Sequence, residues 1–355
     1  MISHRASRIA PSETLKISGR AKALKRQGHN IISLSAGEPD FKTPNYICEA
    51  AITAIKDGHH GYTMNTGTPE LRQSITDKLK RDNSLDYDPA NIVCCNGAKQ
   101  ALGFTVLALV DPEDEVLIPA PYWVSYPQMV NLAEGTPVTV RTSFENEYKL
   151  TPDQLEQSIT SKTKAFILCS PSNPTGARYT RQELEELAKV LRNYPDLYII
   201  SDEIYEYIVF EGEHTSLLEV APDLKERTIL VNGFSKGFAM TGWRLGYLAG
   251  PEEVVGAVSK IQSQETSAPS AISQKAGEAA YNHSLEAVYR MRDQFSNRRD
   301  FIIEELAEIE GVSCFKPQGA FYVFPDISYH LGRKKPDGET VETSTDLCLY
   351  LLEEY

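Results

Sequence analysis

Several features that would assign a protein class at once are missing from this 355-residue sequence. It has no run of about 18 apolar residues, the length that a membrane-spanning helix requires. Its first residues also lack the apolar core of a secretory signal. Its 36 Lys and Arg are outnumbered by 49 Asp and Glu, and 36 − 49 gives a net charge of −13. Since nucleic-acid binding needs a positive surface, we expect neither a nucleic acid nor a membrane as a partner.

Cysteine is scarce as well. Only six cysteines occur, none of them in a C-x-x-C pair, and Cys94 and Cys95 are adjacent. This pattern is typical of reduced thiols, so we expect a cytoplasmic protein without a disulfide framework and without a metal site. The hydrophobic share of 41% and the charged share of 24% are ordinary for a folded chain. The length suits one large domain or two intimate ones.

Short apolar runs that favour β-strands alternate with helical patterns along most of the chain. The clearest predicted helix covers 181–192, where Thr180 and Glu183 form a capping box ahead of an amphipathic pattern, and another covers 99–109. The predicted strands are 91–96, 114–119, 136–141, 164–170, 197–202, 228–233 and 244–250. This alternation predicts an α/β fold, a mostly parallel sheet with helices on both faces. Ligands of such sheets bind beyond the carboxyl ends of the strands.

The pattern changes after about residue 290. A long charged helix is expected over 294–310, followed by two strands within 311–324 and a polar segment over 332–346. The sequence then begins a helix at Asp346 that runs to the last residue, Tyr355. This mixture of helices and strands predicts a second, α+β domain. A helix expected over 12–27 could pack on it.

The residues that follow the first predicted strands suit a phosphorylated, planar ligand. Ala98 and Lys99 begin a helix after small residues, where backbone N–H groups bind anions, although a plain tight turn is the alternative. Trp123 could stack on a flat ring, with ordinary packing as the alternative. Asn173 lies between two prolines, which either aim its amide or merely stiffen the loop. One of these proline bonds could be cis.

The later strand ends carry charge. Asp202 ends a buried strand, where a carboxylate needs a cation unless it serves as a helix cap, and Tyr205 would lie on the same side of a helical turn. Lys236 stands in an apolar stretch, where burial would lower its pKa and make it nucleophilic. Arg244 suits bidentate binding of phosphate. Pyridoxal 5′-phosphate is an aldehyde with a phosphate and a cationic ring nitrogen, so it has a group for each of these residues to bind.

Ser235 and Lys236, followed by Gly-Phe-Ala-Met-Thr-Gly-Trp-Arg, resemble the lysine signature of the class I/II aminotransferases. The segments LSAGEPDF (34–41), GYTMNTGTPELR (61–72), PYWVSYP, SPSNPTG and SDEIY match that family in order and spacing over essentially the whole chain. The resemblance is closest to the aspartate aminotransferases of the Ib subgroup, some of which also accept prephenate. It implies the fold type I architecture with a large domain over 40–285 and a small domain from 1–39 and 286–355.

The same resemblance implies the chemistry. The expected reaction is a ping-pong transfer of an amino group from an L-amino acid, aspartate or glutamate, to a 2-oxo acid. Lys236 would link to the cofactor and shuttle a proton, while Asp202 would pair with the ring nitrogen. The expected contacts of the ring are Asn173, Tyr205 and Trp123. The expected phosphate ligands are Ala98, Lys99, Ser235 and Arg244, with Tyr62 reaching across a homodimer. The expected substrate contacts are Gly37, Trp123 and Asn173.

Two departures from the family leave alternatives open. Position 99 often carries a hydroxyl residue in the family, whereas this chain has Lys99. The family also has a carboxylate-binding arginine in a segment that would begin after Tyr355, so we expect an incomplete small domain with a loosely packed end. Lys99 and Arg20 are candidates for the partner of a substrate side-chain carboxylate. A lyase, an aromatic or prephenate aminotransferase, or an inactive fragment remain alternative functions.

Overall fold

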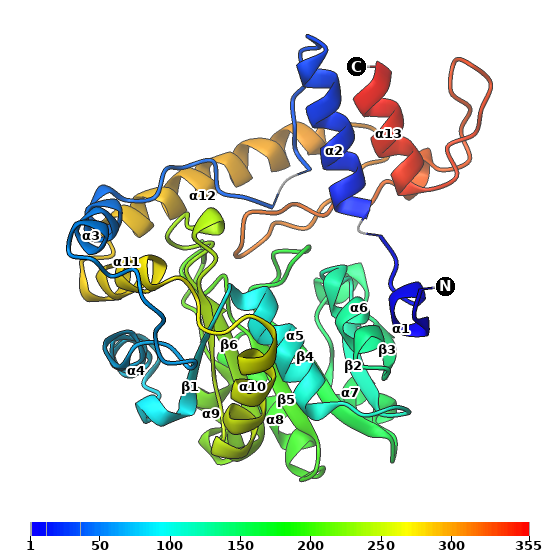
Figure 1. Ribbon diagram of the computed structural model, residues 1–355. Helices are drawn as coiled ribbons and strands as arrows, with labels where there is room; N and C mark the ends of the chain where they lie inside the picture. Colours follow the sequence, from blue (N-terminus) through cyan, green and yellow to red (C-terminus); the bar gives the residue numbers. More distant parts are fainter. Residues whose placement is uncertain (1, 12, 36, 355) are drawn as a thin grey trace.

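A seven-stranded sheet forms the centre of the computed structural model, which describes residues 2–11, 13–35 and 37–354 (Figure 1). The strands lie in the order β1-β7-β6-β5-β4-β2-β3. Their bounds are β1 Ile92–Cys95, β2 Glu115–Ala120, β3 Thr136–Arg141, β4 Thr163–Cys169, β5 Tyr198–Asp202, β6 Thr228–Gly233 and β7 Gly246–Ala249. Each predicted strand is therefore confirmed within about two residues at either end.

Most of the sheet is parallel, as predicted. Strands β2 to β6 pair in parallel, whereas β7 runs antiparallel to both β6 and β1. The last predicted strand, 244–250, is shortened at its start. Arg244 has a left-handed φ of 53° and follows a short 3-10 turn at Thr241–Trp243, so the extended backbone begins only at Gly246.

Successive side chains along each strand point to opposite faces of the sheet, which explains why helices cover both faces. In β4, Ala165 and Ile167 face one apolar core, whereas Phe166 and Leu168 face another. Helices α5, α6 and α10 pack in the first core, and α3, α4, α7, α8, α9 and α11 pack in the second. The helices are α1 His4–Ser7, α2 Glu13–Arg26, α3 Asn45–Lys56, α4 Pro69–Asn83, α5 Ala98–Leu109, α6 Ser125–Leu132, α7 Pro152–Ser158, α8 Arg181–Arg192, α9 Leu217–Val220, α10 Glu252–Glu265, α11 Ala271–Asn282, α12 Glu286–Ala307 and α13 Ser344–Glu354.

Helix α8 forms for the reason that its sequence indicates. The backbone N–H of Glu183 donates to the Thr180 hydroxyl at 3.3 Å, and the Glu183 carboxylate accepts the Thr180 N–H at 2.7 Å. These two bonds complete the predicted capping box, which satisfies backbone donors that the first helical turn leaves unpaired.

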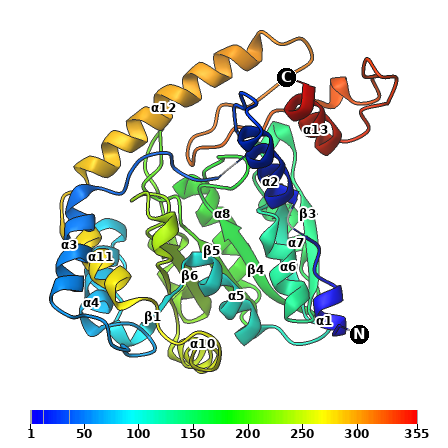
Figure 2. The same cartoon turned by 45° about the horizontal axis from the view of Figure 1, so that its top comes forward.

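Helices α2 and α13 stand apart from the sheet, whereas α12 starts in the second core with the buried Val288 and Met291 and extends toward them (Figures 1 and 2). The charged helix predicted over 294–310 begins earlier and ends earlier, as α12 at Glu286–Ala307. The helix predicted over 12–27 is α2, and the one predicted from Asp346 is α13; Ser12 and Tyr355 lie outside the described residues. Side by side, α2 and α13 are joined by an ion pair of 3.0 Å between Arg20 and Glu353. No described residue of α13 is buried.

The prediction of two strands within 311–324 is wrong. This segment forms only isolated bridges, from Ser313 to Asp326 and from Gly319 to Val209. The chain is drawn toward the sheet domain instead, where the N–H groups of Gln318 and Gly319 both donate to the carbonyl of Gly176. A Cβ on Gly319 would lie 2.7 Å from Pro171, so glycine is required for this close approach.

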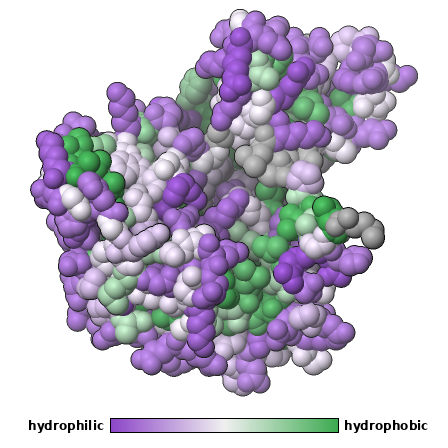
Figure 3. Space-filling view, viewed as in Figure 1, coloured by the Kyte–Doolittle hydropathy of each residue, from purple (hydrophilic) through white to green (hydrophobic). Residues whose placement is uncertain are grey.

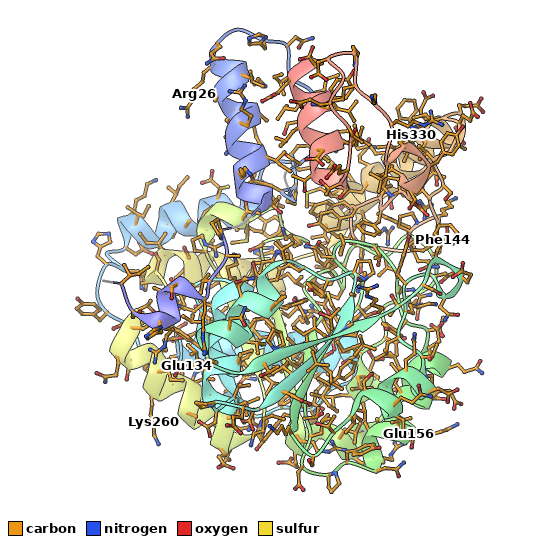
Figure 4. The ribbon with its side chains drawn as sticks, turned by 90° about the vertical axis from the view of Figure 1, so that its right-hand side faces the viewer. Arg26, Glu134, Phe144, Glu156, Lys260 and His330 are labelled. Atoms are coloured by element: carbon orange, nitrogen blue, oxygen red, sulfur yellow. The ribbon has the colours of Figure 1, made fainter. Side chains whose placement is uncertain are left out.

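Two further observations bear on the expected class of protein. Within the described ranges, no helix is both long and apolar enough to cross a membrane. All six cysteines are free, in agreement with the prediction of reduced thiols. Figure 4 shows Arg26 projecting from the outer end of α2, far from Lys260 at the opposite end of the molecule. The domain boundaries at 40 and 286 stay a prediction.

Candidate active site

A cavity of about 630 Å³ opens at the carboxyl ends of the strands and is bordered on its outer side by α2. Thr14, Ser18 and Lys22, which recur every four residues of α2, contribute to its wall. The sequence-predicted site residues that line the cavity are Gly37, Ala98, Lys99, Trp123, Asn173, Asp202, Tyr205, Ser235, Lys236 and Arg244. Tyr62 is not among the lining residues, and its side chain is fully exposed on the same chain.

One end of the cavity is built to bind an anion. Helix α5 begins there at Ala98 after Gly97, which offers no side-chain cap, so the first backbone N–H groups of the helix are left for another acceptor. Gly97 has a φ of 90°, and a Cβ there would lie 2.7 Å from the guanidinium of Arg244. A Cβ on Gly246 would collide with the backbone nitrogen of Ala98. Because Gly97 and Gly246 have no side chains, the N-terminal end of α5, strand β7 and the guanidinium of Arg244 can lie in contact.

Arg244 is held in this position by backbone carbonyls. Its Nη1 donates to the Thr241 carbonyl at 2.9 Å and its Nη2 to the Asn96 carbonyl at 3.1 Å. The guanidinium thus adds a fixed positive charge to the N-terminal end of α5, whose dipole also favours an anion. This combination supports the predicted phosphate site.

Lys236 lies near the middle of the cavity. Its Nζ donates to the carbonyl of Gly37 at 2.5 Å and lies 5.7 Å from the centre of the Tyr205 ring. Burial lowers the pKa of Lys236 to about 8, although the nearby carboxylates of Glu38 and Asp202 oppose this shift. At pH 7 roughly a tenth of the amine is therefore unprotonated and nucleophilic, far more than for a lysine in water.

Asp202 is almost completely buried, with 4% of its surface exposed. Its Oδ2 accepts a hydrogen bond of 2.7 Å from Tyr126, and its Oδ1 accepts one of 3.3 Å from the backbone of Ile204. Burial raises the pKa of Asp202 to about 6, against the effects of these bonds and of Lys236. A cationic partner in the cavity would restore the ionised form, because an opposite charge favours it.

Tyr126 was not predicted as a site residue, although it lies within the quoted segment PYWVSYP. Its ring packs edge-on against Trp123 at 5.4 Å between centroids, so it orients both the carboxylate and the indole. Trp123 is also near Lys99, whose Nζ lies 5.0 Å from the centre of the indole ring. Burial and the charge of Arg244 lower the pKa of Lys99.

A second missed residue, Tyr322, comes from the segment in which strands were wrongly predicted. Its hydroxyl lies 2.6 Å from that of Tyr205, and Asn173 Nδ2 lies 3.5 Å from both. A Cβ on Gly37 would lie 2.6 Å from the same hydroxyl, which explains why a glycine stands there. Asn173 is held by the expected rigid turn, in which both the Ser170-Pro171 and Asn173-Pro174 bonds are cis. The cluster offers hydroxyl and amide groups to one edge of a bound ring.

The cavity therefore combines an anion cradle, a buried carboxylate, an aromatic wall and an amine of lowered pKa. Residues 29–355 match the family model described as aminotransferase class I and II. The chain belongs to the class I and II aminotransferases. The sheet and its helices have the fold type I architecture, as predicted.

Two characterised aminotransferases illustrate the similarity in sequence. The chain is 49% identical to the bifunctional aspartate aminotransferase and glutamate/aspartate-prephenate aminotransferase of Petunia hybrida, covering 99% of this chain and 74% of the relative. It is 46% identical to the aspartate/prephenate aminotransferase of Nitrosomonas europaea, covering 99% and 89%. These names do not favour the lyase alternative.

Solved aminotransferase structures agree with the fold. The aspartate aminotransferase of Rhizobium meliloti superposes with a TM-score of 0.96 at 43% identity, covering 100% of this chain and 89% of that one. The Thermus thermophilus aspartate aminotransferase with maleate gives a TM-score of 0.90 at 39% identity, covering 98% and 93%.

Pyridoxal 5′-phosphate is the cofactor of this aminotransferase family. The residues of the cavity fit it. The uncapped start of α5 beside Arg244 suits the phosphate, the buried carboxylate of Asp202 suits the ring nitrogen, and Lys236 supplies an amine for the aldehyde. The aminotransferase fold thus places the expected groups around one cavity.

Proposed function

We propose that this chain is an aspartate aminotransferase that moves an amino group between a dicarboxylic amino acid and a 2-oxo acid by a ping-pong mechanism. The observation that carries the proposal is the meeting of Lys236 and Asp202 in one cavity with the anion cradle at the start of α5. The cavity also holds a further cation, Lys99, at its aromatic wall. The relatives named aspartate aminotransferases support this choice of substrate.

The phosphate of the cofactor is assigned to residues at the anion end. The backbone amides of Ala98 and Lys99 donate from the helix start, and Arg244 adds a fixed charge. Ser235, which is buried next to Lys236, adds a hydroxyl donor. Binding in this cradle fixes the position and orientation of the ring that follows the phosphate.

The ring is assigned to the middle of the cavity. Asp202 keeps the ring nitrogen cationic, and Tyr126 holds this carboxylate in place. Asn173 and Tyr205, whose polar groups lie 3.5 Å apart, would bind the ring oxygen, and Trp123, which lines the same cavity, would stack on the ring. The bound cofactor supplies an electron sink that stabilises negative charge at the substrate Cα.

Lys236 is assigned both covalent attachment and proton transfer. With the cofactor bound, the free amine of Lys236 would be the base that removes the proton from the substrate Cα. As an ammonium, it would then donate that proton to the aldehyde-derived carbon of the cofactor. The lowered pKa suits this role, since a base acts best when its pKa lies near the working pH. The carbonyl of Gly37 and the ring of Tyr205 position the amine.

The two candidates for the side-chain carboxylate of the substrate are separated by their surroundings. Arg20 pairs with Glu353 on α13 and does not line the cavity, whereas Lys99 lines it. We therefore assign the side-chain carboxylate to Lys99. Asn173, Trp123 and the backbone of Gly37 are assigned to the rest of the substrate.

We further propose a homodimer with shared sites. Tyr62 is fully exposed and does not line the cavity of its own chain, and the exposed apolar residues Met64, Ile52 and Ile55 lie in the same part of the sequence. Figure 3 shows apolar residues gathered on the surface of α3, which carries the last two. In the dimer, Tyr62 would reach the phosphate in the cavity of the partner. The protein is expected in the cytoplasm, with domains at 40–285 and at 1–39 plus 286–355.

A direct assay tests the proposed activity. Purified protein loaded with pyridoxal 5′-phosphate is mixed with aspartate and 2-oxoglutarate, and oxaloacetate is followed by a coupled reaction. We expect turnover together with an absorbance change of the cofactor when aspartate alone is added. Cofactor binding without either response would contradict the proposal. Replacing 2-oxoglutarate by prephenate as the amino acceptor, with aspartate or glutamate as the donor, tests the broader specificity in the names of the relatives.

A further inference from the structure

Four charged side chains are buried together beside Asp202 but outside the cavity lining. They are Lys78, Glu203, Glu206 and His214, each with a side chain at most 8% exposed. None of them has a role in the proposed chemistry. Because burying charge is costly unless it is compensated, such a cluster needs an explanation.

The cluster consists of two ion pairs. Lys78 from α4 pairs with Glu206, and Asn83 donates to the same carboxylate at 3.2 Å. His214 Nε2 lies 2.9 Å from Glu203 Oε2, while the hydroxyls of Ser201 and Ser216 donate to Glu203 Oε1 at 2.8 and 2.7 Å. Three polar groups thus contact the two oxygens of Glu203, which matches an ionised carboxylate, because such a group only accepts hydrogen bonds.

The balance of charge fixes the state of His214. Two carboxylates face one lysine, so the cluster is neutral only when the imidazole is protonated. The groups around it are Glu203, Glu206, Lys78 of α4 and Glu219 of α9, which in turn pairs with Arg181 of α8. Burial alone would lower the pKa of His214, but its bond to Glu203 and the charges of both carboxylates outweigh burial and raise it.

The cluster is coupled to the cavity through the chain itself. Glu203 directly follows Asp202, and Ser201, which binds Glu203, directly precedes it. The backbone N–H of Glu203 donates to the Val231 carbonyl at 2.9 Å, which ties this turn to β6. The negative charge of Glu203 raises the pKa of Asp202, although burial contributes more. An uncompensated charge on Glu203 would therefore disfavour the ionised form of Asp202.

We propose that His214, as an imidazolium, is a positioning residue for the cofactor: it cancels the charge of Glu203 so that the adjacent Asp202 stays ionised for a cationic ring nitrogen. The role of the ring nitrogen belongs to the proposed function, on which this inference rests. His214 does not line the cavity, so it acts only through Glu203 and Asp202.

A charge-rescue experiment tests this role through cofactor affinity. Apoprotein is titrated with pyridoxal 5′-phosphate at neutral pH, and binding is followed by absorbance. His214→Gln leaves Glu203 charged, and we expect about tenfold weaker binding, which corresponds to a rise of about one unit in the pKa of Asp202. Adding Glu203→Gln removes the charge, so the double variant should recover to within about threefold of the wild type.

The controls separate charge from packing. Asp223→Asn breaks an exposed, bidentate pair with Arg192 and should leave the affinity unchanged. If the imidazole only fills space, the double variant will bind no better than His214→Gln, and the proposal is overturned. A single variant within about twofold of the wild type overturns it as well.

The wild-type protein offers a second test that does not depend on a variant that folds. Nuclear magnetic resonance of ¹⁵N-labelled histidine should show one buried imidazolium that persists at pH 7. If all buried imidazole is neutral at pH 6, His214 does not carry the proposed charge. Wild-type protein that binds the cofactor without transaminating aspartate would contradict the proposed function and leave these affinity tests valid.

Discussion

Two ion pairs in this molecule look alike and are expected to differ greatly in importance. Lys78 and Glu206 pair inside the sheet domain, with side chains 0% and 4% exposed, whereas Arg20 and Glu353 join α2 to α13, with side chains 46% and 45% exposed. The first pair has been removed from water, so losing one partner strands a buried charge. The second stays hydrated whether or not it forms. Ion pairs in the sheet domain should therefore contribute more to stability than those of the outer helices, because they are buried and not because their contact distances are shorter.

The largest effect is expected in the cavity itself. Lys236→Ala removes both the covalent link and the proton-transfer base, so turnover of aspartate should fall by about 10,000-fold or more. Steady-state assays of the cofactor-loaded variant measure the loss. Lys260→Ala, which removes an exposed lysine of α10, is the matched control and should keep wild-type activity. Turnover of Lys236→Ala near that of the control would refute the role of Lys236.

The next largest effect should appear in stability. Lys78→Met leaves the buried Glu206 without its cation, and we expect the free energy of unfolding to fall by about 3–5 kcal/mol. Denaturation with urea measures it. In the same helix, Lys80 pairs with Asp86 at an exposed position, and Lys80→Met should cost less than about 1 kcal/mol. Equal losses in the two variants would remove the distinction between buried and exposed pairs.

A smaller and selective effect is expected at the wall of the cavity. Lys99→Ala should lower kcat/KM for aspartate by about 10- to 100-fold, because a charged contact with the substrate side chain is lost. The value for alanine, which has no side-chain carboxylate, should change little. Parallel kinetics with both amino acids give the ratio. A uniform loss for both substrates would show that Lys99 supports the phosphate or the indole of Trp123 instead.

The smallest effect should come from the outer helices. Arg20→Ala should change the free energy of unfolding by about 0.5 kcal/mol or less, with kcat for aspartate unaltered. Urea denaturation and the standard assay, run beside Lys78→Met, provide the contrast. A large loss of stability would show that α2 and α13 contribute more to the fold than their exposure indicates.

The sequence predicted the sheet well, because each strand carries its own local signal. Residues such as Asp202 and Lys236 could also be found, since chemistry placed at the end of an apolar run is visible in the sequence alone. Tyr126 and Tyr322 were missed because their importance lies in partners 76 and 117 residues away. The burial of Lys78 was missed for the same reason: a lysine in an amphipathic helix predicts an exposed side chain, and only the tertiary contact with Glu206 explains its position.

The segment 311–324, where two strands were predicted, shows a different limit. Its strand-like sequence depends on having a partner strand, but in the described part of the chain it finds only isolated bridges. The close approach of Gly319 to Pro171 and the bonds to Gly176 decide its path instead. Such long-range contacts leave no periodic trace in the sequence.

The position of β1 at the edge of the sheet has a consequence for the order of assembly during synthesis. Among the described strands it pairs with β7 alone, and the pairing joins Ile92 to Ala249. Everything between them must leave the ribosome before β1 can dock and before Gly246 can meet the start of α5. A nascent chain ending short of β7 would therefore have no complete phosphate cradle. The cofactor is expected to be captured late, by an almost finished sheet, and not to guide the first folding steps.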